Sequence, residues 1–247
     1  MITVIISNVS GNGAKFIGTN LAVSLINKKK EKKVLLVDFD LNSPTLGYGF
    51  YEHNEKTNNF NIIMHQLYQR DIDKNNISKN IIQTKFGLDL LEGFKLTEID
   101  ITEDISQDMY VKFFNALKEM YDEVIIVSNI NIYSQLSIMT MKNADKIVLV
   151  GRNNRTNIEV ISRTHEVLNT YTNAKRYLIN NMHERKDIQL KNLPLLKDYM
   201  FLGNITYSRT KTDNQDLFKG KYSKLNFNNR IINKAVDLLF DDGGKHE

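Results

Sequence analysis

Residues 2–40, ITVIISNVSGNGAKFIGTNLAVSLINKKKEKKVLLVDFD, contain two apolar runs separated by a glycine turn and a helical pattern. Residues 2–7 and 34–37 are continuous and aliphatic, which is typical of buried strands. Between them, apolar residues recur at helical spacing and predict a helix over 15–27. Strand, turn, helix and strand in this order predict a βαβ unit with parallel strands and a right-handed crossover.

The same alternation continues along the rest of the chain. We expect further helices at 62–69, 107–121, 135–142, 157–170 and 228–240, and strands at 81–84, 88–91, 124–127, 146–150, 176–179 and 202–207. The predicted fold class is α/β, a doubly wound and mostly parallel sheet with helices on both faces. Because the chain has two prolines and no Gly/Ser-rich linker, we expect a single domain over 1–247.

Composition and hydropathy argue against a metal site, a secretion signal and a membrane span. The chain has no cysteine, and its five histidines show no ligand spacing, so we expect no metal centre. The first residues lack the basic lead and long apolar core of a signal peptide, and no stretch reaches the roughly 18 apolar residues of a membrane span. We therefore expect a cytoplasmic protein.

Residues 10–17, SGNGAKFI, lie at the turn where such a βαβ unit can bind phosphate. A working phosphate-binding loop reads Gly-x-x-x-x-Gly-Lys-[Ser/Thr]: its amides cradle the phosphates, its Lys neutralises the β/γ oxygens and its hydroxyl holds Mg²⁺. Here Ala14 stands at the lysine position and Lys15 at the hydroxyl position. A fixed positive charge would therefore face the metal that accompanies ATP and repel it.

From residue 2 to about residue 222 the order of motifs resembles the MinD/ParA family of P-loop ATPases, which includes the TadZ/CpaE proteins and bacterial tyrosine kinases. The most specific match joins NLAVSL to VLLVDFDL with the family's spacing. The matching segments are 20–25, 34–41, 87–93 (GLDLLEG), 121–126 (YDEVII), 144–150 (ADKIVLV) and 202–205 (LGNI). The resemblance implies the P-loop NTPase fold, with ATP as the family's cofactor.

The departures from this family fall on the positions that carry its chemistry. The family's signature Lys aligns with Val9, its main phosphate Lys with Ala14, its Mg²⁺ hydroxyl with Lys15 and its Walker B Asp with Val127. By the same resemblance, the candidate ATP-binding residues are Gly11, Asn12, Gly13, Ala14, Lys15, Phe16 and Asn180, the last at the family's adenine-binding Asn.

Two carboxylates, Asp38 and Asp40, end the second predicted strand. The resemblance assigns the orientation of the attacking water to the second of them, so Asp40, with Asp38, is the candidate catalytic residue of an active enzyme. Both could equally be a polar strand terminus. A one-residue slip of register is a further alternative: Lys15 would then serve as the phosphate lysine, but Phe16 would take the hydroxyl position.

Loss of these charged groups favours weak binding of ATP over its hydrolysis. The leading hypothesis is a non-catalytic or nearly inactive localisation or assembly module that binds itself, as a nucleotide-independent homodimer, and a protein partner. The family context suggests a surface-appendage, secretion, conjugation or segregation system. The alternative is an unconventional ATPase that uses Lys15 and Asp40 to position cargo on DNA or membrane.

Three segments bear on other partners. The basic run 28–33 is interpreted as a solvated turn, with an anionic surface as the alternative. The apolar face of helix 228–240 is expected to pack on the domain, because its acidic end argues against a peripheral membrane helix. A set of basic residues raises the alternative of DNA binding: Arg152, Arg155, Arg163, Lys175, Arg176, Arg185 and Lys186.

Overall fold

The structure is a computed structural model of the chain. It describes residues 1–7, 9, 11–40, 44–47, 50, 59–84, 86–93, 104–129, 131, 134–183, 189–206 and 227–241. The predicted residues Arg185 and Lys186 and the end of the predicted strand 202–207 lie outside these ranges.

The described residues form a central sheet of eight strands, in the order β3-β4-β2-β5-β1-β6-β7-β8. Its strands are β1 (Ile2–Ser7), β2 (Val34–Phe39), β3 (Ile82–Gln83), β4 (Asp89–Leu91), β5 (Glu123–Asn129), β6 (Lys146–Gly151), β7 (Lys175–His183) and β8 (Met200–Thr206). All neighbouring strands pair in parallel except β3 and β4. The doubly wound, mostly parallel α/β sheet predicted from the sequence is confirmed.

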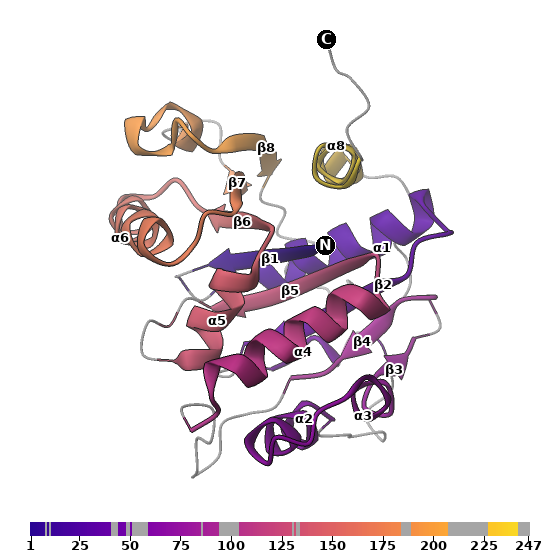
Figure 1. Cartoon of the computed structure of the whole chain (residues 1–247). Coiled ribbons are helices and arrows are strands. Elements are labelled where there is room, and N and C mark those ends of the chain that lie inside the picture. Colours follow the sequence, from indigo (N-terminus) through magenta and orange to yellow (C-terminus); the bar gives the residue numbers. More distant parts are fainter. Residues whose placement is uncertain are drawn as a thin grey trace.

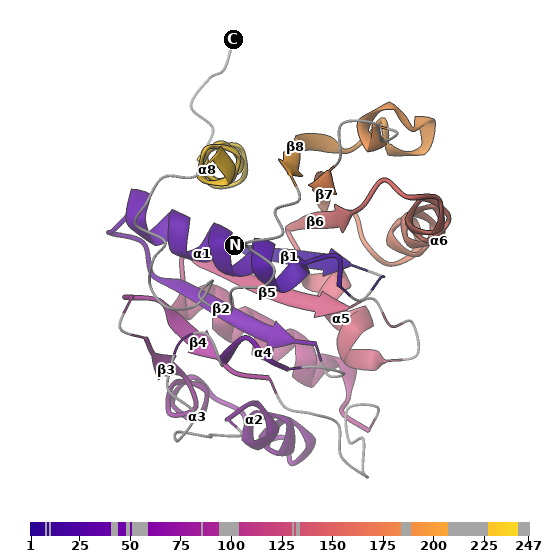
Figure 2. The same ribbon diagram turned by 180° about the vertical axis from the view of Figure 1, so that it is seen from behind.

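Helices cover both faces of this sheet (Figures 1 and 2). They are α1 (Ala14–Lys28), α2 (Asn59–Tyr68), α3 (Lys74–Ser78), α4 (Gln107–Met120), α5 (Gln135–Asn143), α6 (Arg155–Tyr171) and α8 (Phe227–Phe240), with short 3₁₀ turns η2 (Leu190–Asn192) and η3 (Pro194–Leu196). One core lies under α1 and α8, and a second joins α2, α4, α5 and α6 to the opposite face. The strands alternate between these cores: Val37 faces the second, whereas Leu36 faces the α1 core.

The long helices and the strands predicted from periodicity are confirmed, with ends that shift by a few residues. The sequence did not predict α3, because its five residues are too short to show a helical period. The antiparallel pairing of β3 with β4 was likewise not predicted. A tight turn produces it: the Thr84 N–H donates to Leu88 O at 2.9 Å, and Gly87 adopts a φ of 76°.

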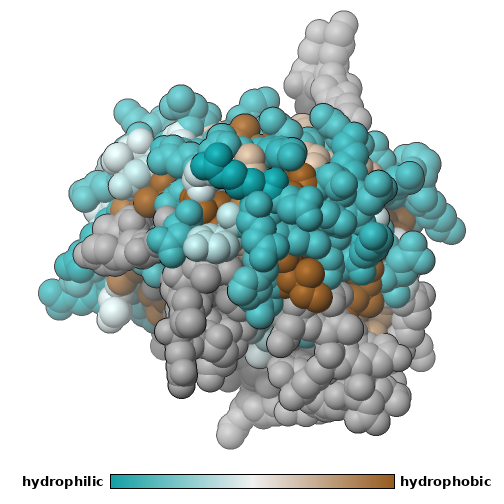
Figure 3. Space-filling view, turned by 60° about the horizontal axis from the view of Figure 1, so that its bottom comes forward, coloured by the Kyte–Doolittle hydropathy of each residue, from teal (hydrophilic) through white to brown (hydrophobic). Residues whose placement is uncertain are grey.

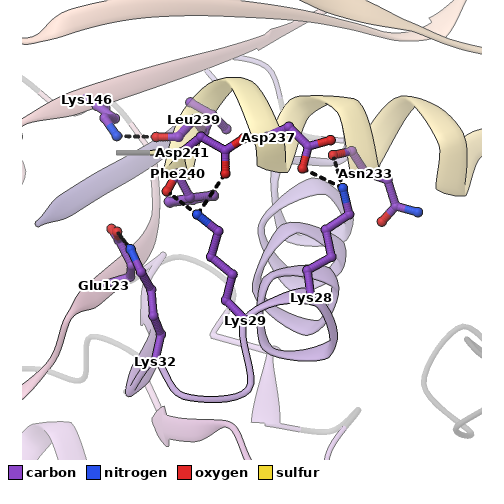
Figure 4. A network of polar contacts seen from close by, with 10 residues as sticks. All are labelled: Lys28, Lys29, Lys32, Glu123, Lys146, Asn233, Asp237, Leu239, Phe240 and Asp241. Atoms are coloured by element: carbon purple, nitrogen blue, oxygen red, sulfur yellow. Dashed lines mark hydrogen bonds and ion pairs between the residues drawn. The ribbon is translucent and has the colours of Figure 1, made fainter. Parts of the chain in front are cut away.

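The last helix, α8, is held on α1 by apolar packing and by lysines (Figure 4). Lys28 pairs with Asp237 at 2.5 Å, and Lys29 pairs with Asp241 at 2.8 Å and donates to Phe240 O at 2.7 Å. Lys146, which is buried, donates to Leu239 O. The Lys29 and Lys146 ammonium groups satisfy carbonyls at the negative end of the helix. The prediction that this helix packs on the domain is confirmed.

The described part of one face shows small apolar areas. The face in Figure 3 is mostly hydrophilic, with separate hydrophobic patches. Among the described residues, the large apolar side chains that are most exposed are Met1, Ile62, Tyr68, Val111 and Met200. No helix in the described ranges is long and apolar enough to cross a bilayer.

Candidate functional site

The glycine turn lies between the carboxyl end of β1 and the first residue of α1. Gly11 and Gly13 both adopt positive φ angles, 82° and 87°, and Gly13 is the N-cap of α1. The Ile17 N–H donates to Gly13 O at 2.9 Å and so begins the helix. Because Gly13 has no side chain to cap the helix, the first turn of α1 presents its amides at this edge of the sheet.

Lys15, in the first turn of α1, points toward the end of β2. Its Nζ lies 2.9 Å from Asp40 Oδ2 and donates to Thr45 Oγ1 at 3.1 Å. The other oxygen of Asp40, Oδ1, accepts from Asn129 Nδ2 at 2.6 Å. The side chains of Lys15 and Asp40 are only 20% and 12% exposed, so this ion pair is largely shielded from water. The structure thus brings the predicted residues Lys15 and Asp40 together, with Thr45 and Asn129 added.

Asp38 is fully buried beside this pair. Its Oδ1 accepts from the Asp40 N–H at 3.1 Å and its Oδ2 from the Leu46 N–H at 3.0 Å. Burial raises the pKa of the Asp38 carboxyl to about 6, and the nearby Lys15 ammonium and the two amides oppose that rise. Asp38 therefore fixes the backbone after β2, and it is two residues from Asp40 on the same face of the strand.

The Walker B position is apolar. Val127 lies beside Asp38 across the β2–β5 register and faces α1 in the core. A side chain at Gly18 would collide with a Val127 methyl group, so α1 packs directly on this residue. The position aligned with the family's carboxylate is therefore filled by packing.

A chain of asparagines holds the glycine turn from its other side. Asn181 Nδ2 donates to Asn12 O at 2.7 Å, and Asn12 Nδ2 donates to Asn157 Oδ1. Asn154 caps α6 by accepting from the Asn157 N–H at 2.9 Å. The turn is thereby connected to β7 and to the start of α6.

Asn180, predicted as an adenine-binding residue, contacts β8. Its Nδ2 donates to Asn204 Oδ1 on β8 at 2.9 Å, and its side chain is fully buried. The neighbouring Asn181 reaches the glycine turn because it shares strand parity with Tyr177 and Ile179, which face the α1 core. That parity is the sequence signal that identifies Asn181.

Gly13→Ala should destabilise the protein more than the matched variant Gly11→Ala. Both variants force alanine into a positive φ and pay a similar strain of roughly 1 kcal/mol. An added Cβ at Gly13 would collide with Asn181 Nδ2, whereas one at Gly11 meets no described atom within 4 Å. Displacing Asn181 breaks its bond to Asn12 O, so we expect an extra loss of about 1–2 kcal/mol in urea unfolding. Equal losses in the two variants would contradict this role of Asn181.

Two of the basic residues proposed for DNA binding, Arg155 and Arg176, lie far apart. Arg155 begins α6, whose 17 residues span about 25 Å, whereas Arg176, on β7, lies beside the other end of that helix. Arg176 donates to Leu168 O and Thr172 O at the C-terminus of that helix, at 3.3 and 3.4 Å. These contacts use the guanidinium within the protein, which weakens the alternative of DNA binding.

The described residues contain no cluster of three or more His, Cys, Asp or Glu suited to hold a metal ion. No protein-family model and no curated protein matches this chain. Solved structures do match it. A plasmid partition protein from Borrelia burgdorferi is 21% identical with a TM-score of 0.68, over 95% of this chain and 96% of that one.

Two further structures extend this likeness. MinD from Pyrococcus horikoshii in complex with Mg-ADP is 19% identical with a TM-score of 0.74, over 97% of this chain and 96% of that one. The chain has the MinD/ParA fold. A chain of the MinC:MinD cell division complex from Aquifex aeolicus is 18% identical with a TM-score of 0.74, over 100% of this chain and 98% of that one. At these identities the likeness establishes the MinD/ParA fold and leaves the activity to the residues of the site.

Proposed function

We propose that this protein is a non-catalytic or nearly inactive MinD/ParA-like module that acts in localisation or assembly by binding itself and a protein partner. The observation that carries the proposal is the Lys15–Asp40 ion pair, 2.9 Å long, at the glycine turn. Lys15 stands at the position of the family's Mg²⁺-binding hydroxyl, and Asp40 at the position of its water-positioning Asp. Lys15 neutralises the Asp40 carboxylate. Neither group is then available for its part in hydrolysis.

Hydrolysis needs cations placed around the γ-phosphoryl group as it leaves, and one such cation is worth about 10³ to 10⁵ in rate. The aligned positions Val9, Ala14 and Val127 bring no charge to this edge of the sheet. Lys15 brings one positive charge, which Asp40 balances, and Asp38 lies buried next to both. The described site therefore has no cation in excess of its carboxylates.

Binding of ATP is less affected than hydrolysis. Loss of one charge-assisted contact costs about 1.5–3 kcal/mol, or roughly one to two decades of affinity. The amides of the first turn of α1 remain as donors. We therefore propose that ATP binds weakly and is not required for the protein's contacts.

Solved structures of the same fold support a protein partner. The Aquifex protein is in complex with MinC, and the Borrelia protein is a plasmid partition protein. We propose a protein partner in a surface-appendage, secretion, conjugation or segregation system, with self-association through contacts that do not include a bound nucleotide.

Sedimentation velocity with and without ATP·Mg²⁺ tests this proposal. The expected result is the same distribution of oligomers under both conditions, because the Lys15–Asp40 pair is already formed in the free protein. Lys28→Ala, which alters another lysine of α1 far from the turn, should leave that result unchanged. An oligomer that forms only with ATP·Mg²⁺ would contradict the proposal.

One observation favours a second candidate, an unconventional ATPase. Lys15 and Asp40 place an ammonium and a carboxylate at the edge of the sheet where this fold binds its ligand. For turnover, Lys15 would have to leave Asp40 for the phosphates. Phosphate release that depends on Lys15 would support this candidate.

A further inference from the structure

Lys15 occupies an unfavourable place in its own helix. It is the second residue of α1, and the first turn contains no acidic residue. The N-terminus of a helix carries a partial positive charge, which repels an ammonium group. Lys15 therefore gains nothing from α1 itself, and the contacts that stabilise its charge come from elsewhere in the chain.

Those contacts join separate parts of the fold. The ammonium links α1 to Asp40, just after β2, and to Thr45 in the segment 44–47. Asn129 at the end of β5 supports the same carboxylate through its second oxygen. One side chain thus connects a helix, the ends of two neighbouring strands and the segment that follows β2.

The segment 44–47 is also fixed to the sheet next to this ammonium. The Leu46 N–H donates to Asp38 Oδ2 at 3.0 Å, and the Leu46 side chain is fully buried in the α1 core. Pro44 lies close to Gly93: a Cβ added at Gly93 would be 2.8 Å from the Pro44 Cβ. Leu46 and Pro44 are therefore packed closely. The polar contacts of the segment named here are made by the side chains of Lys15 and Asp38.

We propose that Lys15 is a built-in cation that holds residues 44–47 against the end of β2, so that this arrangement forms without nucleotide or metal. Lys15 is a positioning residue in this account: it acts on the segment through Thr45 and Asp40. The role concerns the protein before any nucleotide binds, so turnover of ATP would overturn the proposed function and leave this role intact.

Amide hydrogen exchange of Leu46 measures the effect directly. In the wild-type protein, the Leu46 amide should be protected and should exchange at the same rate with and without ATP·Mg²⁺. Lys15→Ala should speed its exchange at least tenfold, because Thr45 loses its donor and Asp40 its cation. The matched control Lys28→Ala removes an ion pair at the other end of α1 and should leave Leu46 unchanged.

Chemical rescue separates a cation effect from general damage. Propylammonium, which replaces the lost end of the lysine, should restore Leu46 protection in Lys15→Ala, and tetramethylammonium, which has no N–H donor, should not. If Lys15→Ala does not fold, Lys15→Met keeps the aliphatic stem for the same exchange measurement. In the wild type, acetylation of Lys15 should also be at least tenfold slower than that of exposed Lys112.

Three results would overturn the proposal. Unchanged Leu46 exchange in the Lys15 variants would show that the ammonium does not hold the segment. Equal acceleration in Lys28→Ala would assign the effect to a general loosening of α1. Wild-type protection that appears only with ATP·Mg²⁺ would show that the nucleotide, and not Lys15, orders residues 44–47.

Discussion

Phosphate release from ATP·Mg²⁺ is expected to stay at the buffer rate when the wild-type protein is added. The cations that stabilise a leaving γ-phosphoryl group are worth about 10³ to 10⁵ each in rate. Here the aligned lysine positions are Val9 and Ala14, and Lys15 is paired with Asp40. A continuous phosphate assay, run beside a working P-loop ATPase, should show a rate at least about a thousandfold below that enzyme.

The variants Lys15→Ala and Asp40→Ala make this prediction specific. Neither should change phosphate release, since neither residue contributes to a reaction that does not occur. Steady wild-type turnover that Lys15→Ala abolishes would contradict the prediction and support the unconventional ATPase. Gly11→Ala serves as a control, because it alters the same turn without touching either charge.

The stability of the wild-type protein should fall as the pH rises from about 4 to 7, relative to that of Asp38→Asn. The pKa of Asp38 is raised from 3.8 to about 6 in the folded protein, mainly by burial. The folded state therefore holds this proton more tightly than the unfolded state, and the stabilisation is lost as the pH passes the folded pKa. The full effect is about 3 kcal/mol, of which about 1–2 kcal/mol lies between pH 5 and pH 8.

Urea unfolding of both proteins at pH 5 and pH 8 measures this difference. Asp38→Asn leaves one acceptor oxygen for the amides of Asp40 and Leu46. We therefore expect this variant to be less stable than the wild-type protein at pH 5. The pH dependence of the variant's stability nevertheless lacks the Asp38 contribution. The wild type and the variant therefore differ in the slope of unfolding free energy against pH, and this difference reports the Asp38 carboxyl alone. Equal slopes would show that the Asp38 pKa is not raised.

The fold could be predicted because long elements of this chain repeat their polarity at the periods of strands and helices. The pattern of residues 2–40 predicted β1, α1 and β2, and no end was wrong by more than two residues. Short elements carry too few residues for a period, which is why α3 was missed. The packing of α8 on the domain was predicted from its acidic end. Its position on α1 was not, because the lysines that hold it there come from distant parts of the chain.

The candidate site was predictable only where residues lie near each other in sequence. The register set by Asn20 placed Ala14 and Lys15 at the chemical positions of the turn. Thr45 and Asn129 reach Lys15 and Asp40 only after the sheet forms, so no local pattern shows them. Asn181 was identifiable by strand parity, whereas Asn180 was chosen from the resemblance, at the position of the family's adenine-binding Asn.

Calorimetric titration of the wild-type protein with ATP, in Mg²⁺ and again in EDTA, tests the central claim most directly. The claim is that Lys15 already supplies the cation that pairs with Asp40, so that Mg²⁺ gains no further stabilisation from this carboxylate. We predict weak binding that Mg²⁺ does not strengthen. Tight binding in Mg²⁺ that EDTA lowers by tenfold or more would show that the metal enters the site beside Lys15, and would contradict the account.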